Sequence, residues 1–178
     1  MISFRELHAA GDPLVLPNAW DVASAAALVA AGFPAIGTTS LGVAAAHGLP
    51  DAAGRARAET AALARRLGSL PCLCTVDVEA GFSEGPADVA ELAAELAATG
   101  AAGINIEDGR PGGLADPGRH ADLVRAVAET EPGLFVNARV DTYWLGVDAT
   151  PERTLRRAER YIAAGADGIF VPGQLSAA

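Results

Sequence analysis

Hydrophobic runs alternate with amphipathic stretches along most of this chain. The apolar runs predict strands near residues 14–18, 35–40, 72–79, 103–108, 134–141 and 168–172. Helical periodicity predicts a short N-terminal helix, followed by helices near 21–31, 55–67, 86–99, 117–129 and 151–164. Glycines that suit helix C-termini recur with a period of one strand plus one helix, at Gly32, Gly68, Gly100, Gly133 and Gly165. The pattern therefore predicts a repeated strand–helix unit.

Repeated units of this kind form either an open doubly wound sheet or a closed barrel. Polar residues at the predicted strand ends favour the α/β class with a (β/α)8 TIM-type barrel, because barrel enzymes place their sites there. The sequence contains six predicted strands in 178 residues, whereas a complete barrel takes about 250. We therefore expect a single, incomplete α/β-barrel domain over residues 1–178, truncated after the sixth strand.

Local signals support the predicted helices. Pro86, Pro117 and Pro151 are each placed at a first helical position, and the latter two follow residues that cap helices well. Charged residues within the helices are interpreted as solvated faces. On the last helix these residues are Arg156, Arg157, Glu159 and Arg160.

Polar residues share parity at the ends of three apolar runs. Alternate side chains of a strand point to the same face, which groups Asp77 with Glu79, Asn105 with Glu107, and Asn137 with Arg139 and Asp141. Carboxylates that converge at a barrel mouth repel one another unless a cation is present. The pattern therefore predicts a cation site beside an anion site.

The residue types narrow the cation. Asp77, Glu79 and Glu107, with water at the remaining positions, suit Mg²⁺ or Mn²⁺, which prefer oxygen ligands. Zinc is disfavoured, because the chain has 3 histidines and they lack ligand spacing. Arg139 is open to two interpretations: it pairs with Glu107 or Asp141, or it clamps a substrate carboxylate.

Composition excludes several function classes. A net charge of −9 argues against a nucleic-acid partner. The chain has neither a signal-peptide pattern nor the roughly 18–20 uninterrupted apolar residues of a membrane span, so we expect a soluble, cytoplasmic protein without a membrane partner. All 13 basic residues are arginine, which excludes Schiff-base, pyridoxal-phosphate and P-loop lysine chemistry. Cys72 and Cys74 have the parity opposite to Asp77, so we interpret them as small buried hydrophobes.

Several ordered motifs resemble the isocitrate lyase / phosphoenolpyruvate mutase family, particularly its short bacterial members. The resemblance spans nearly the whole chain. The motifs are Leu16-Pro17-Asn18-Ala19-Trp20-Asp21, Gly37-Thr38-Thr39-Ser40, Gly48-Leu49-Pro50-Asp51, Asp77-Val78-Glu79-Ala80-Gly81, Asn105-Ile106-Glu107-Asp108, Asn137-Ala138-Arg139-Val140-Asp141 and Gly165-Ala166-Asp167-Gly168-Ile169-Phe170-Val171-Pro172-Gly173.

The resemblance implies a Mg²⁺-dependent lyase that acts on a small 2-oxo acid or related carboxylate through a metal-stabilised enolate. It implies that Asp77 is the principal metal ligand, and that Glu79 and Glu107 hold the metal directly or through water. Thr39, Ser40, Leu41 and Arg139 are implied to bind the substrate. Asp51, which by itself reads only as a turn former or cap, is implied to lie near the reacting group. A homo-oligomer, a tetramer for a full-length chain, is also implied.

The chain departs from the family after the Glu107 strand. The lyase branch carries a flexible loop of the Lys-Lys-Cys-Gly-His type there, whereas this chain reads Gly109-Arg110-Pro111-Gly112-Gly113-Leu114. The glycines suit a moving lid, and Arg110 remains a candidate contact for an anionic substrate. Three alternatives stay open beside carbon–carbon cleavage or decarboxylation: phosphonopyruvate or carboxyphosphonoenolpyruvate mutase-like chemistry, a catalytically silent relative or fragment, and another metal-dependent barrel aldolase.

Overall fold

A parallel sheet forms the centre of the protein in a computed structural model that describes residues 2–9 and 11–173. Its strand order is β1-β2-β3-β4-β7-β8, and every neighbouring pair is parallel. The strands are β1 (Asn18–Ala19), β2 (Ala35–Thr38), β3 (Leu73–Asp77), β4 (Gly103–Glu107), β7 (Phe135–Arg139) and β8 (Gly168–Phe170). The predicted repeat of strand–helix units is confirmed.

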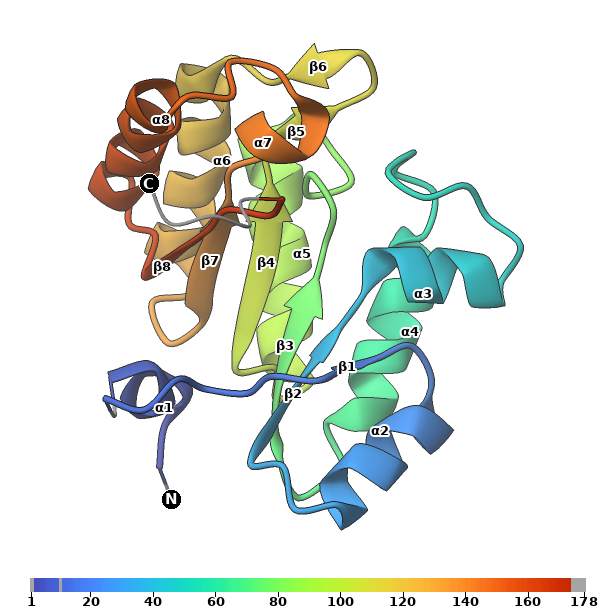
Figure 1. The fold of residues 1–178 in the computed structure, drawn as a ribbon. Helices are drawn as coiled ribbons and strands as arrows, with labels where there is room; N and C mark the ends of the chain where they lie inside the picture. Colours follow the sequence, from blue (N-terminus) through green and yellow to red (C-terminus); the bar gives the residue numbers. More distant parts are fainter. Residues whose placement is uncertain (1, 10, 174–178) are drawn as a thin grey trace.

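Helices cover one face of this sheet (Figure 1). They are α2 (Val22–Ala30), α4 (Arg57–Leu67), α5 (Pro86–Ala98), α6 (Pro117–Thr130) and α8 (Pro151–Ala163). Helix α1 (Phe4–Ala9) lies near the amino ends of the strands. The predicted helix starts are confirmed, since proline lies in the first turn of α5, α6 and α8.

The main core lies between the sheet and these helices. Strand residues such as Val76, Ile104 and Val136 are fully buried there against Leu96 and Val124. Cys74 is buried in this core and Cys72 packs against it, as strand parity predicted; both are free thiols. Burial raises the pKa of the Cys74 thiol to about 12, consistent with an inert core residue. Asn105 and Asn137 have the opposite parity and line the other face, which bears cavities.

Three short elements at the carboxyl end of the sheet were not predicted. They are α3 (Ser40–Ala46), α7 (Thr142–Leu145) and the antiparallel pair β5 (Gly109–Arg110) with β6 (Gly113–Leu114). The expected glycine-rich loop after β4 is therefore a hairpin. The strands are also shorter than predicted at this end, because the chain turns into these elements once the ladder stops.

The first predicted strand, 14–18, is largely wrong. Only Asn18 and Ala19 pair with β2. Proline lacks a backbone N–H, so Pro13 and Pro17 cannot donate to a ladder. Leu14 and Leu16 instead pack with Phe4, Ala35 and Phe135 in a second small core.

The described sheet is open, with β1 and β8 at its two edges. The α/β fold with a parallel sheet is thus confirmed, while closure into a barrel and truncation of one remain predictions. Within residues 2–9 and 11–173, no helix combines the length and apolar character needed to cross a membrane.

Candidate active site

A cavity of about 290 Å³ lies at the carboxyl ends of the parallel strands. It brings together seven of the residues that the sequence predicted for the site: Thr39, Ser40, Leu41, Asp51, Asp77, Glu107 and Arg139. The carboxyl ends of parallel strands meet at one edge of a sheet, and this is where α/β proteins place their ligands. The structure thus brings these residues together, while their assignment as a functional site and their individual roles remain predictions.

Asp77 ends strand β3 and is held by hydrogen bonds from the backbone. Its Oδ2 accepts from the backbone N–H of Ser40 at 2.9 Å, and its Oδ1 accepts from that of Glu79 at 3.2 Å. The N–H of Asp77 itself donates to Thr38 Oγ1 at 2.9 Å. Asp77 forms no ion pair in the part of the chain that the structure describes, so its charge has no cationic side chain opposite it there.

Glu79 is buried beside Asp77, but not by continuation of the strand. Strand β3 stops at Asp77, and Glu79 has a φ of +50°, in the left-handed region that favours glycine. The side chain lines a second cavity of about 210 Å³, with Glu107 lining both cavities. The prediction that Asp77 and Glu79 share a strand face is therefore wrong, although both carboxylates reach the same region.

The carboxylate of Glu79 is only half satisfied. Its Oε2 accepts from the backbone N–H of Gly54 at 2.9 Å, while Oε1 is buried without a hydrogen-bond partner among the described residues. Burial raises the pKa of Glu79 and the Gly54 N–H opposes this, while the charges of Asp51 and Asp77 raise it further. A buried carboxylate oxygen without a donor is expected where a cation or its water belongs.

Arg139 ends strand β7 between two carboxylates. Its Nη1 lies 2.9 Å from Glu107 Oε2, and its Nε donates to Asp141 Oδ1 at 2.6 Å. The guanidinium carbon also lies 5.7 Å from the ring centres of both Trp144 and Phe170. Arg139 thus pairs with both of the carboxylates between which the sequence left the choice open. Its Nη2 has no hydrogen-bond partner among the described residues, and Arg139 lines the cavity.

Burial dominates the electrostatics of this pair. It raises the pKa of Glu107 to about 7, against the opposing charge of Arg139 and with the help of Asp141, Asp77 and Asp51. The pKa of Asp141 is raised by burial as well, again opposed by Arg139. A cation at this end of the sheet would favour the ionised form of both carboxylates.

The donor set fits a hydrated divalent cation better than a closed cage of side chains. Within residues 2–9 and 11–173, no three His, Cys, Asp or Glu side chains are grouped closely enough to hold a metal directly. The unpaired charge of Asp77 and the unsatisfied Oε1 of Glu79 still require compensation. Mg²⁺ commonly keeps several waters and takes one or two carboxylates, which matches this arrangement.

Two residues that the sequence predicted to bind substrate, Arg110 and Ser40, already use hydrogen-bond donors within the protein. Arg110 lies outside the cavity of Asp77: its Nε donates to Glu84 at 2.9 Å and its Nη1 donates to the carbonyl oxygens of Glu107 and Gly109. Because Nε and Nη1 of Arg110 already donate within the protein, they are not free to bind a substrate in that cavity. Helix α3 begins at Ser40, whose N–H is already bound to Asp77.

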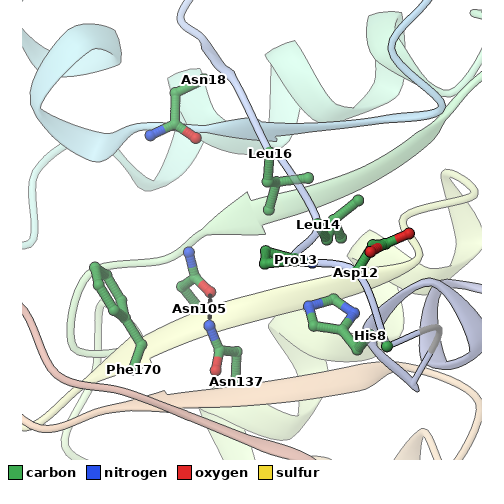
Figure 2. Close-up of a pocket in the computed structure, with 10 residues that line it drawn as sticks. His8, Asp12, Pro13, Leu14, Leu16, Asn18, Asn105, Asn137 and Phe170 are labelled. Carbon is green, nitrogen blue, oxygen red and sulfur yellow. Dashed lines mark hydrogen bonds between the residues drawn. The ribbon is translucent and has the colours of Figure 1, made fainter.

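Figure 2 shows three asparagines, Asn18, Asn105 and Asn137, that line another pocket beside the strands. Asn137 Nδ2 donates to Asn105 Oδ1 at 2.8 Å, and Asn18 projects from β1. These residues border a third cavity of about 590 Å³, which shares Asn18, Asn105 and Phe170 with the first. Sequence parity found Asn105 and Asn137. It missed Asn18, Trp144 and Phe170. Asn18 and Phe170 lie within quoted motifs, whereas Trp144 had no signal in the sequence.

Arg157 was wrongly assigned to a solvated helix face. Its Nη1 donates to Asp108 Oδ2 at 2.9 Å, to the carbonyl oxygen of Ala115 and to the Tyr161 hydroxyl. Asp108 itself is completely buried. Of the arginines on α8, Arg157 turns inward because it pairs with the buried carboxylate of Asp108. The spacing of charges along α8 contains no information about that partner.

Acidic and basic side chains converge here at the carboxyl ends of parallel strands, which is the edge at which α/β proteins bind their ligands. Comparison with known proteins gives the family. The chain belongs to the phosphoenolpyruvate phosphomutase family, whose model matches residues 4–178, within the phosphoenolpyruvate mutase/isocitrate lyase superfamily. The family resemblance predicted from the motifs is thereby confirmed.

Individual relatives agree with this assignment. An uncharacterized protein of Mycobacterium tuberculosis is 50% identical over 96% of this chain and 65% of its own length. The 2-methylisocitrate lyase of Bacillus subtilis is 35% identical over 94% of this chain and 58% of its own length. The structure of phosphoenolpyruvate phosphomutase from Streptomyces platensis superposes with a TM-score of 0.85 at 27% identity, covering 94% of this chain and 62% of that one. The chain thus spans about three-fifths of the length of these relatives.

Proposed function

We propose that this protein is a Mg²⁺-dependent lyase for a small 2-oxo acid or related carboxylate, acting by carbon–carbon cleavage or decarboxylation through an enolate. One observation carries the proposal: two features lie at the same end of the sheet. Asp77 and Glu79 have no cationic side chain opposite them among the described residues, and Arg139 is held in a fixed direction by its own contacts. A small carboxylate with an adjacent oxo group needs both: a cation for its oxygens and a fixed donor for its carboxylate.

Each residue has a distinct role in this proposal. Asp77 would be the principal metal ligand, with Glu79 and Glu107 acting directly or through water. When bound, Mg²⁺ would act as a Lewis acid that stabilises negative charge on the enolate oxygen. Arg139 presents Nη2 to the substrate carboxylate, and the start of α3 from Thr39 to Leu41 lies beside it. Asp51 lines the same cavity, and in this proposal it would transfer a proton at the reacting group.

Phosphonomutase-like chemistry is the second candidate, because the matching family model is that of phosphoenolpyruvate phosphomutase. A phosphonate carries more negative charge than a carboxylate and asks for additional cationic donors. Arg110 already donates from Nε and Nη1 to Glu84, Glu107 and Gly109, so Arg139 is the arginine that faces the cavity. This difference favours the lyase over the mutase.

Calorimetric titration with oxalate, a planar enolate mimic, tests the site directly. Wild-type protein is expected to bind oxalate only when Mg²⁺ is present, and Asp77→Ala is expected to abolish that binding. Asp122→Ala is the matched control, because Asp122 is an exposed carboxylate on α6 that pairs with Arg125. Retained binding in Asp77→Ala would overturn the assigned metal ligand, and absence of binding in the wild type would favour a catalytically silent relative.

Turnover assays separate the chemistries. Oxaloacetate, alkylmalates, methylisocitrate and phosphonopyruvate are each incubated with the protein, with Mg²⁺ or with excess EDTA. Mg²⁺-dependent release of a 2-oxo acid from one of the first three supports the lyase. Turnover restricted to phosphonopyruvate supports the mutase instead. Exchange of pyruvate methyl protons without cleavage of any of the four compounds would point to another metal-dependent aldolase.

A further inference from the structure

Asp108 is a completely buried carboxylate that faces away from the cavity. It follows Glu107 at the end of β4, so strand parity directs it to the helix-covered face. Its Oδ1 accepts from the backbone N–H of Asp141 at 2.8 Å. Its Oδ2 accepts from the Tyr161 hydroxyl at 2.7 Å and from Arg157 Nη1 at 2.9 Å. One carboxylate thus joins β4, the end of β7 and helix α8.

These contacts continue into the candidate site as a closed ring. Asp108 holds the backbone of Asp141, whose Oδ1 accepts from Arg139 Nε at 2.6 Å. Arg139 Nη1 pairs with Glu107 Oε2 at 2.9 Å, and Glu107 is bonded covalently to Asp108. The backbone N–H of Asp108 also donates to the carbonyl oxygen of Arg139 at 3.1 Å, which locks the two strand ends together.

The opposite side of Asp141 is packed equally closely. A Cβ atom at Gly109 would collide with the Asp141 carboxylate, so the hairpin backbone lies directly against it. Asp141 therefore has little freedom to shift once Asp108 holds its N–H. The direction of the Arg139 guanidinium follows, because two of its three nitrogens are already committed within the ring.

We propose that Asp108 is a positioning residue that aims Nη2 of Arg139 into the cavity by anchoring Asp141 to Tyr161 and Arg157 of α8. The assignment deepens the proposed function, because it rests on Arg139 as the clamp for the substrate carboxylate. It adds that helix α8, which lies outside the cavity, sets the orientation of that clamp.

The chemistry of the contacts identifies a selective variant. A carboxylate accepts on both oxygens, whereas the amide of Asn accepts on one side and donates on the other. In Asp108→Asn, the amide NH₂ therefore faces either the N–H of Asp141 or the donors of Tyr161 and Arg157. One side of the anchor must break in either orientation, with almost no change in side-chain volume.

Hydrogen exchange of the Arg139 Nε–H, followed by ¹⁵N NMR without ligand, tests the ring itself. The resonance is assigned by its loss in Arg139→Lys. Exchange is expected to be slow in the wild type and about tenfold faster in Asp108→Asn, because a tenfold change corresponds to about 1.4 kcal/mol, which is in the range for the loss of one hydrogen bond. Tyr161→Phe, which removes one of the two donors to Oδ2, is expected to give a smaller acceleration and covers the case in which Asp108→Asn does not fold.

Thr154→Val is the matched control. Its hydroxyl hydrogen bonds to that of Thr142 at 2.6 Å, so this variant removes another buried tether to α8 outside the ring. Arg139 exchange is expected to stay at the wild-type rate in Thr154→Val. Equal acceleration in Thr154→Val, or an unchanged rate in folded Asp108→Asn or in Tyr161→Phe, would overturn the positioning role.

Oxalate titration of the same variants links the ring to ligand binding. Asp108→Asn is expected to weaken oxalate binding about tenfold at saturating Mg²⁺, in line with the usual effect of residues that orient a ligand-binding group. The Mg²⁺ affinity measured alone should stay near that of the wild type. Unchanged oxalate affinity in a variant with fast Arg139 exchange would overturn the link to binding. A wild type that binds no oxalate would contradict the proposed function. The exchange rates of Arg139 in the wild type and in Asp108→Asn would still support or overturn the ring by themselves.

Discussion

The two halves of the candidate site treat their charges in opposite ways. At the end of β3, Asp77 and Glu79 are held by backbone N–H groups and meet no arginine in the part of the chain that the structure describes. At the ends of β4 and β7, Glu107 and Asp141 both contact Arg139, and Asp108 contacts Arg157. We refer to these as the acidic half and the paired half.

The difference shows which charges the fold itself compensates. Burial raises the pKa of Glu79, Glu107 and Asp141 alike, so all three ionised carboxylates are costly in the folded protein. Arg139 offsets part of this cost in the paired half. The acidic half lacks such an arginine, and its compensation is left to a bound cation. Without ligand, the paired half therefore has a counter-charge in the folded protein, whereas the acidic half has none among the described residues.

Removal of Arg139 is the strongest challenge to this contrast. Arg139→Met keeps an unbranched side chain but leaves Glu107 and Asp141 buried without a counter-charge. We expect a loss of about 2–4 kcal/mol in the free energy of unfolding, measured by urea titration at pH 7. Arg125→Met, which breaks the exposed pair with Asp122, should cost less than about 1 kcal/mol. Similar losses in both variants would contradict a compensated half.

Acidification tests the stability of the residues that pack behind the paired half, His120 and Tyr161. His120 is completely buried, neither ring nitrogen has a hydrogen-bond partner among the described residues, and its ring meets Tyr161 edge-on with centroids 4.8 Å apart. Burial lowers the pKa of His120 from 6.5 to about 4. The unfolded chain therefore binds a proton below pH 6.5 that the folded protein does not bind until about pH 4.

Acid therefore favours the unfolded chain, which binds the additional proton at His120. The free energy of unfolding should fall as the pH drops from 6.5 toward 4, by about 3 kcal/mol from His120 alone. His120→Phe keeps a ring of similar size against Tyr161 and removes the titration. Urea unfolding of both proteins at pH 7 and pH 4.5 provides the measurement. An equal loss of stability in wild type and His120→Phe would show that His120 carries no part of it.

The acidic and paired halves also differ in how far the sequence predicted them. Period and parity predicted the strands of both halves, the helices that cover them and the inward direction of Asp77, Glu107 and Arg139. These features depend on local patterns repeated many times, such as a proline in the first turn of α5, α6 and α8. Whether Arg139 pairs with a neighbour or waits for a ligand depends on distances between strands, which parity does not contain.

Prediction failed where the strands end. Parity assumes an extended backbone, and Glu79 leaves it with a φ of +50°, while Asp141 lies beyond the last residue of β7. The short elements α3, α7 and β5–β6 are too brief for periodicity to define them; contacts with the rest of the fold decide their conformation. Asp108 had a signal, since a carboxylate with core parity requires a buried partner, but nothing in the sequence pointed to Arg157 and Tyr161.

A substitution at Glu79 gives the smallest effect and the sharpest contrast between the halves. Glu79→Gln retains an oxygen for the N–H of Gly54 and removes the charge that Asp51 and Asp77 repel. Because the pKa of Glu79 is raised in the folded protein, ionisation at neutral pH opposes folding, and the metal-free variant should be more stable by on the order of 1 kcal/mol. Urea unfolding with EDTA measures this gain.

Added Mg²⁺ should reverse the order of stability of the wild type and Glu79→Gln, since a cation that binds only the folded state stabilises the protein with the stronger site. Glu84→Gln, which alters an exposed carboxylate paired with Arg110, should show no reversal. A Glu79→Gln variant that is less stable than the wild type without metal would mean that the acidic half is compensated by the chain itself, as the paired half is.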